Sequence, residues 1–151
     1  MRRRMILTAV ALSALLWGLA PCGLEAGEAR LSFVGHLQHG RVQGGTEFSA
    51  QSLGDLRIVV EYRDLSGINH TQRIELYSPD GSLYQRFSTA FKVAATVAKL
   101  KASDRWEPVE TRLPVWGTWI TQYSLFGAWL VEVYLDRERM PITTGVFVLS
   151  P

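Results

Sequence analysis

Three histidines are the residues of this chain best suited to bind a metal ion. His36 and His39 lie three residues apart in "VGHLQHG", residues 34–40, and His70 lies in a turn-rich segment. On a helix, His36 and His39 would share a face, whereas on a strand they point to opposite sides. Transition-metal sites usually need three or four protein ligands. We therefore expect no metal and no cofactor, and convergence of the three histidines in space is the alternative.

Two pairs of carboxylates have a spacing that could serve glycoside hydrolysis. Glu107 and Glu110 form one pair, and Asp136 and Glu138 form the other. Glycosidases place two carboxyl groups on opposite sides of a sugar cleft. These pairs lie in expected turns or edges beside arginines, which favours solvated charge. The chain also has no G-x-S-x-G motif for nucleophilic catalysis. We predict that the protein is not an enzyme.

Aromatic residues are the strongest indication of a binding site. Five of them fall within twenty-one positions: Trp106, Trp116, Trp119, Tyr123 and Phe126. Prolines and glycines interrupt this stretch, so some of these side chains must lie on loops or edges. Exposed aromatics form contact surfaces for sugars or for a protein partner. The alternative is that they cap the open end of the domain. Because side chains alternate along a strand, we expect Trp116 and Trp119 on opposite sides, one of them in the core.

The elements that would carry these residues are short strands separated by turn residues. Alternating or apolar runs predict strands at 31–37, 56–62, 72–78, 83–89, 127–136 and 141–151. The run 42–50 holds a Gly pair, and we expect a short strand after it. Residues 105–115 contain two prolines and are expected to form an edge or broken strand. We interpret 117–121 as a short strand and favour strand over helix for 91–104. The total of seven to nine short strands, with no clear helix, predicts an all-β antiparallel sandwich.

Two of these strands allow more specific predictions. "SPDGS", residues 78–82, combines Pro, Asp and Gly in the order that a tight turn needs, which predicts a hairpin. The last two strands are expected to form a second hairpin. Trp129 heads the strand 127–136 and shares a face with Val131, Val133 and Leu135. A large aromatic in that position is expected between two sheets, in the core.

Two segments resemble a known class of domain. "SLFGAWLVEVYLD" (124–136) and "IELYSPDGSLYQRF" (74–87) resemble a late strand and the central hairpin of Ig-like β-sandwich modules of secreted bacterial proteins. The resemblance implies an Ig-like sandwich. It implies no particular function, because this superfamily hosts many. The chain lacks the Cys…Trp…Cys framework of antibody-type domains.

The N-terminus has the layout of a secretory signal peptide. Three arginines, residues 2–4, precede an uncharged, mostly apolar run of sixteen residues, 5–20. That run is shorter than the about 20 residues of a stable transmembrane helix. We expect a signal peptide over 1–29, with cleavage near Ala26 or Ala29. A single domain over 30–151 would follow, in a secreted or periplasmic protein.

Cys22, the only cysteine, qualifies the prediction of export. "LAPC", residues 19–22, resembles a bacterial lipobox, although Pro21 stands where a small residue is expected before the cysteine. If Cys22 is lipidated, the protein is an outer-membrane lipoprotein. Contact with a membrane is otherwise expected only through an uncleaved signal. A lone cysteine also allows no intramolecular disulfide.

Charge excludes one further class of function. The formal net charge is +2, and three of the positive charges belong to the N-terminal arginines. The remaining Lys and Arg are scattered among Asp and Glu, so we expect no nucleic-acid binding. We predict a non-catalytic interaction module that docks on a protein partner or presents an edge strand to it. The alternative is a carbohydrate-binding module that uses the exposed aromatics on polysaccharide. A metal carrier or enzyme comes third.

Overall fold

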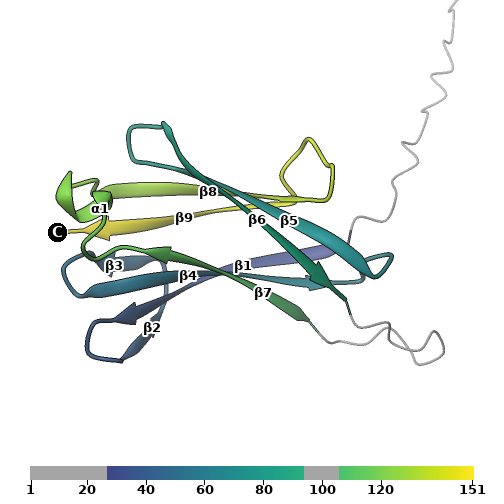
Figure 1. Ribbon diagram of the computed structural model, residues 1–151, viewed down its shortest axis with the longest axis horizontal. Coiled ribbons are helices and arrows are strands. Elements are labelled where there is room, and N and C mark those ends of the chain that lie inside the picture. The colour runs from purple at the N-terminus through teal and green to yellow at the C-terminus, as the bar shows by residue number, and fades with distance from the viewer. Residues whose placement is uncertain (1–26, 94–105) are drawn as a thin grey trace, which may run out of the picture.

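Two β-sheets packed face to face make up the computed structural model, which describes residues 27–93 and 106–151 (Figure 1). The elements are β1 (Glu28–Leu37), β2 (Val42–Gly44), β3 (Glu47–Ser49), β4 (Leu53–Arg63), β5 (Asn69–Tyr77), β6 (Leu83–Lys92), β7 (Glu107–Pro114), α1 (Trp119–Gln122), β8 (Gly127–Leu135) and β9 (Thr143–Ser150). One sheet has the order β2-β1-β4-β7, and the other has the order β3-β9-β8-β5-β6. The prediction of an all-β sandwich is confirmed, and the nine strands within the described residues lie at the upper end of the expected number.

Buried apolar side chains recur at every second position along β4 and β8, which explains why these strands lie at the centre of the two sheets. On β4, Ile58, Val60 and Tyr62 are at most 1% exposed. On β8, Trp129 is fully buried, as predicted, and the Val131 and Val133 side chains on the same face are buried with it. The Trp129 ring is stacked on Phe147 of β9 at 6.0 Å. The inner faces of the two sheets therefore share one apolar core.

A chain of hydrogen bonds also joins the two sheets through this core. The Tyr62 hydroxyl, on β4, donates to Gln72 Oε1, on β5, at 2.8 Å. Gln72 Nε2 in turn donates to Thr111 Oγ1, on β7, at 3.3 Å. Burial, with a smaller contribution from the charge of Asp136, raises the pKa of Tyr62 above its usual range. The hydroxyl therefore stays protonated and remains a donor inside the core.

Both predicted hairpins are present. β5 and β6 pair antiparallel across the turn 78–82. There Gly81 adopts a φ of +82°, and the Asp80 carboxylate accepts the Ser82 backbone N–H at 3.0 Å. β8 and β9 also pair antiparallel. The strand predicted at 105–115 is β7, an edge strand as expected. Of the segment 91–104, residues 91 and 92 complete β6, and residues 94–104 lie outside the described part of the chain.

The expectation of a purely antiparallel arrangement is wrong at one pair of strands. β3 runs parallel to β9, with Phe48 opposite Leu149. In the run 42–50 a short strand was expected after the Gly pair, and β3 lies there; β2 precedes it, and Gly45, which separates the two strands, has a φ of +144°. β2 stays beside β1, whereas β3 crosses to the other sheet. A strand that changes sheets can pair in either direction, and its sequence does not specify which.

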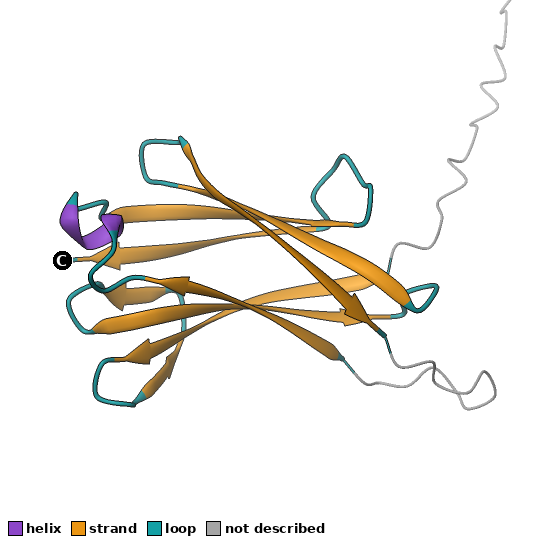
Figure 2. Cartoon of the chain, viewed as in Figure 1, coloured by secondary structure: helices purple, strands orange, loops and turns teal. Residues whose placement is uncertain are grey.

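The short strand expected at 117–121 is also wrong, because α1 occupies this position. Gly117 has a φ of +71°, which ends the extended run that leaves β7. Thr118 then acts as the N-cap, and its side chain accepts the Ile120 backbone N–H at 3.3 Å. Figure 2 shows this short helix at one end of the sandwich. None of the helices in the described residues is long and apolar enough to cross a membrane.

β1 begins two residues before the expected start of the domain. Glu28 pairs with Arg63 and Ala29 pairs with Tyr62 across the β1–β4 ladder. The Glu28 carboxylate also forms an ion pair with the Arg63 guanidinium. Cleavage after Ala26 would leave β1 whole, whereas cleavage after Ala29 would remove its first two residues. Residues 1–26 lie outside the described residues, so the signal peptide and the lipidation of Cys22 stay predictions.

We expect a protein that starts at Gly27 to be more stable than one that starts at Arg30. The shorter form loses the β-pairing of Glu28 and Ala29 and should unfold with a free energy lower by about 1–2 kcal/mol, the net value of one or two hydrogen bonds. Urea unfolding of the two forms measures the difference. Identical midpoints would show that the first two residues of β1 add nothing to the sandwich.

Candidate functional site

The five aromatic candidates lie at two ends of the sandwich. The Trp116 backbone N–H donates to the Gly54 carbonyl, at the start of β4. The Trp106 ring instead lies against the Arg63 guanidinium, at the end of β4, with the Arg63 carbon 4.8 Å from the ring centre. At 3.3 Å per residue, these two points on β4 are roughly 30 Å apart. Trp106, which also contacts Arg30, therefore does not join the other aromatics.

Three of the candidates are exposed on the connection between β7 and β8. Trp116, Trp119 and Tyr123 are 54%, 66% and 63% exposed, and we call them the aromatic knob. The rings of Trp119 and Tyr123 are 5.2 Å apart with their planes inclined by 44°. The expectation that Trp116 or Trp119 lies in the core is wrong. It assumed a regular strand, but Trp116 lies in a turn and Trp119 begins one turn of helix, and both side chains are exposed.

Short-range hydrogen bonds hold the knob in shape. Thr118 Oγ1 donates to the Val115 carbonyl at 2.7 Å while it caps α1. Thr121 Oγ1 donates to the Thr118 carbonyl at 3.1 Å. The Gln122 side-chain amide donates to the Gly117 carbonyl at 3.3 Å. Backbone groups that a one-turn helix leaves unpaired are thus satisfied by neighbouring side chains.

The core supports the knob from beneath. Ile120, between the two exposed aromatics of α1, is fully buried. The Trp129 indole N–H donates to the Leu125 carbonyl at 3.1 Å. The Leu125 backbone N–H in turn donates to the Ile120 carbonyl at 2.9 Å. Phe126 is partly buried and packs against the core, so its ring supports the knob and is not part of its exposed surface.

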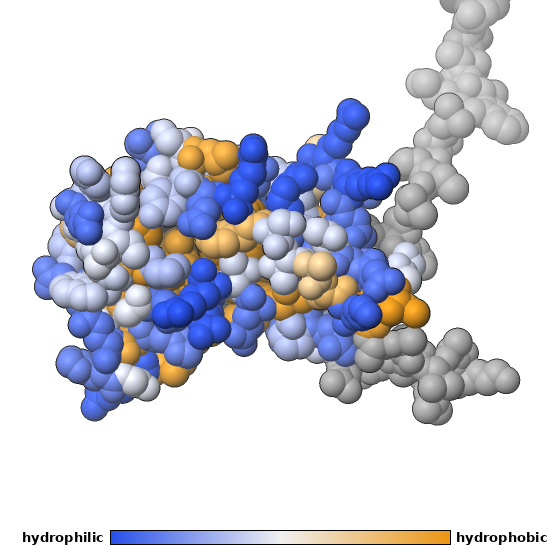
Figure 3. Space-filling view, in the orientation of Figure 1, coloured by the Kyte–Doolittle hydropathy of each residue, from blue (hydrophilic) through white to orange (hydrophobic). Residues whose placement is uncertain are grey.

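The segment that contains the knob carries no charge. None of the 19 residues from Leu113 to Val131 is Asp, Glu, Lys, Arg or His. In contrast, the face seen in Figure 3 is mostly hydrophilic, with separate apolar areas among the charged residues. The cores of protein–protein interfaces are depleted in charged residues and enriched in Trp and Tyr. The knob has this composition.

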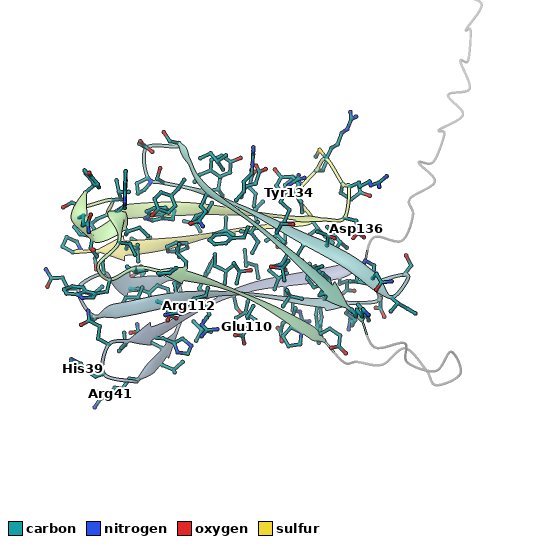
Figure 4. The ribbon with its side chains drawn as sticks, viewed as in Figure 1. His39, Arg41, Glu110, Arg112, Tyr134 and Asp136 are labelled. Atoms are coloured by element: carbon teal, nitrogen blue, oxygen red, sulfur yellow. The ribbon has the colours of Figure 1, made fainter. Side chains whose placement is uncertain are left out.

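The histidines do not converge. His36 lies on β1 opposite Asp55 near the start of β4, whereas the His70 ring packs against Phe91, which is stacked on Tyr62 near its end. Within residues 27–93 and 106–151, no three His, Cys, Asp or Glu side chains are grouped so that they could hold a metal ion. Figure 4 shows His39 at the end of the molecule opposite to Asp136.

One carboxylate expected to be solvated has specific partners instead. Asp136 Oδ2 lies 2.9 Å from His70 Nδ1, and Asp136 Oδ1 accepts the Thr71 backbone N–H at 2.8 Å. Partial burial acts to raise the pKa of Asp136, but the hydrogen bonds from His70 and Thr71 outweigh it and lower that pKa. His70 and Asp136 are 66 residues apart, so their spacing contains no sign of this pair. Glu110 conforms to expectation, since it is exposed and pairs with Arg57 at 3.3 Å.

Comparison with known proteins yields a likeness of fold. No protein-family model matches the chain, and a search of the curated proteins finds no match. Among solved structures, the chain is similar to an immunoglobulin-like protein from Pseudomonas aeruginosa. That likeness covers 85% of this chain and 100% of the other, with 16% identity and a TM-score of 0.39. At this identity the match has no bearing on ligands or partners.

Two neighbouring substitutions on α1 should have very different effects on stability. Ile120→Ala should lower the free energy of unfolding by about 2–5 kcal/mol, because it leaves a cavity in the core. Trp119→Ala should change it by no more than about 0.5 kcal/mol, as is usual at exposed positions. Urea unfolding of both variants tests this assignment. A comparable loss in the two variants would show that Trp119 is part of the core.

Proposed function

We propose that the protein is an exported, non-catalytic interaction module that docks on a protein partner through the aromatic knob. The observation that carries this proposal is the exposure of Trp116, Trp119 and Tyr123 together on one hydrogen-bonded turn. Trp and Tyr are the residues that most often dominate binding energy at protein interfaces. The knob is already ordered by the core beneath it, so binding would cost little conformational entropy.

The shape of the knob favours a protein partner over a sugar. Trp119 and Tyr123 pack against each other at an inclination of 44°, so their rings do not form one flat stacking surface. Sites for small ligands are usually concave. Three clefts formed by described residues lie elsewhere, and none has a knob residue in its lining. A projecting aromatic pair is complementary to an apolar pocket on another protein.

The edge strands provide less support for docking by strand addition. β2 and β3 have three residues each, and β7 contains Pro108 and Pro114. β6 is longer and carries Arg86 and Lys92. Short strands, prolines and charged side chains are the features that discourage pairing with another chain. We therefore assign the docking surface to the knob.

Capture from extracytoplasmic extract should depend on the knob. The tagged protein is incubated with extract of the source organism and crosslinked, and retained proteins are identified. We expect one dominant partner, whose affinity falls roughly 10-fold or more with Trp119→Ala or Tyr123→Ala, as for interface hot spots. Trp106→Ala is the matched control, because it removes a tryptophan at the other end. Equal loss with Trp106→Ala, at unchanged stability, would contradict the assignment.

The carbohydrate alternative rests on the same exposed rings and has its own test. Stacking of a sugar on Trp116 or Trp119 should change tryptophan fluorescence as glycans are added. A saturable change that disappears in Trp119→Ala would replace the protein partner with a polysaccharide. If a broad glycan panel produces no response, the carbohydrate alternative loses its support.

A further inference from the structure

We propose a second site, in which an extended, uncharged peptide segment of another protein adds as a strand to an open edge of β9. On that side of β9 the neighbouring strand is β3, and it pairs only with residues 148–150. β3 itself offers little to a further strand, but because it is so short it leaves residues 143–147 of β9 uncovered. We call these residues the open edge. This proposal is independent of the knob.

The hydrogen bonds of the covered part of β9 identify the backbone groups that point out of the open edge. The Val148 N–H donates to the Thr46 carbonyl at 2.7 Å, so it faces the β3 side. Backbone groups of successive residues point alternately to the two sides of a strand. The ladder between β8 and β9 has no register shift over residues 143–149, so this alternation continues along β9. The N–H and C=O groups of Thr144 and Val146 therefore point to the side that β3 leaves uncovered.

The open edge lacks the features that usually protect an edge strand. Unpaired backbone groups of an edge are a template for another chain, and charged residues or prolines normally discourage such pairing. Residues 143–147 contain neither a charged residue nor a proline. Within the described residues, no strand pairs with the outer side of this stretch. Across the sandwich, the uncovered start of β1 carries the charges of Glu28 and Arg30, so we assign the added strand to β9.

A cleft beside the open edge determines which kind of segment fits. β2 pairs with β1 only at residues 34–36, so both sheets are uncovered on this side of the sandwich. The cleft between them has a volume of about 440 Å³, and the β2–β3 connection lines one part of it. None of the described residues that line it is charged. A charged side chain that entered the cleft would lose its hydration and find no ion partner, so the site favours an uncharged segment.

Gly145, in the middle of the open edge, brings the two sheets close together at the cleft. A Cβ at Gly145 would lie 2.6 Å from Leu31 Cδ2 and 3.2 Å from Phe33 Cζ. The two β1 side chains therefore pack directly on the backbone of β9, and the Phe33 ring lies 5.2 Å from that of Phe147. Leu31 remains only partly buried, and Val146 is 48% exposed. Apolar surface is thus left uncovered on both sides of the cleft.

An added strand would satisfy both the backbone and the apolar surface. Its backbone would pair with Thr144 and Val146, and every second side chain would point toward Leu31 and Phe33. At roughly 3.3 Å per residue the open edge is about 17 Å long, which is the length of an ordinary strand. Apolar residues with a preference for strands, such as valine, suit the inward positions, and uncharged polar residues suit the outward ones.

The test uses a short synthetic peptide in which valine alternates with threonine, flanked by glutamine and carrying a fluorophore. Fluorescence anisotropy measures its binding to the purified exported protein, and amide hydrogen exchange followed by NMR locates it. We expect saturable binding. The amide protons of Thr144 and Val146 should exchange at least 10-fold more slowly in the complex, because each becomes hydrogen-bonded to the peptide.

Two N-methylated forms of the peptide test for backbone pairing while the protein stays wild type. One is methylated at the threonine nitrogens and the other at the valine nitrogens, and in a strand these two sets point to opposite sides. We expect one set to lower the affinity at least 10-fold and the other to change it by no more than about 3-fold. Which set is sensitive depends on the direction of the added strand. An equal effect of the two sets would show that the peptide does not bind as a strand.

Variants of Val146 separate the open edge from the rest of the molecule. Val146→Pro removes an N–H that faces the open edge, so it breaks no hydrogen bond to β8, and proline is tolerated at such positions. Peptide affinity should fall at least 10-fold. Val146→Thr is the matched control, because it keeps the N–H and a β-branched side chain, and it should bind as the wild type does. Trp119→Ala should also bind normally. Thermal melts verify that each variant is folded.

Three further results would overturn the proposal, and each can be obtained with the wild-type protein alone. Absence of saturable binding would show that the open edge is no peptide site. Protection confined to amides outside β9 would place the peptide elsewhere. A dimer that protects Thr144 and Val146 without any peptide would make a second copy of the chain the occupant. None of these results bears on the knob, because its test depends on Trp119 and Tyr123.

Discussion

Burial of Trp129 between the two sheets is the interaction on which the rest of the structure depends. Its ring is stacked on Phe147 and meets Tyr84 edge-on at 5.1 Å, so it joins three strands of one sheet. Its indole N–H donates to the Leu125 carbonyl, in the connection that contains α1. A tryptophan in a core must find a partner for this N–H, and here that requirement fixes the loop that presents the aromatic knob. The core and the candidate interface are thus one packing unit.

The two ends of the sandwich have opposite chemical character. The end with α1 exposes aromatic rings on an uncharged segment. The other end has a buried imidazole, two carboxylates and an apolar groove. Between them, the bond from Tyr62 to Gln72 and the bond from Gln72 to Thr111 join the sheets across the core. Buried hydrogen bonds of this kind specify how two apolar faces align, since any slip leaves a polar group unpaired. Both ends are therefore held on a common rigid body.

The knob and the groove at the other end of the sandwich differ in shape. The knob exposes a pair of packed aromatic rings, whereas the groove is a cleft of about 380 Å³. The distance between them, over most of the length of β4, makes them independent surfaces.

Local sequence determined the strands, because alternation and turn chemistry act over a few residues. Ile58, Val60 and Tyr62 face the core as their period of two requires, and Trp129 lies where its alternating valines predicted. Local patterns gave a wrong prediction at α1, because residues 117–121 also fit a short strand. Gly117 and the Thr118 cap turn this segment into a helix instead. Local patterns also gave the wrong direction for β3, because that direction depends on its pairing with β9. Phe48 on β3 and Ser150 on β9 are 102 positions apart in the sequence. The pairing of His70 with Asp136 and the separation of Trp106 from the knob were decided only in three dimensions. Both follow from which strands lie side by side, and strand order comes from the packing of whole sheets, which no short stretch of sequence encodes.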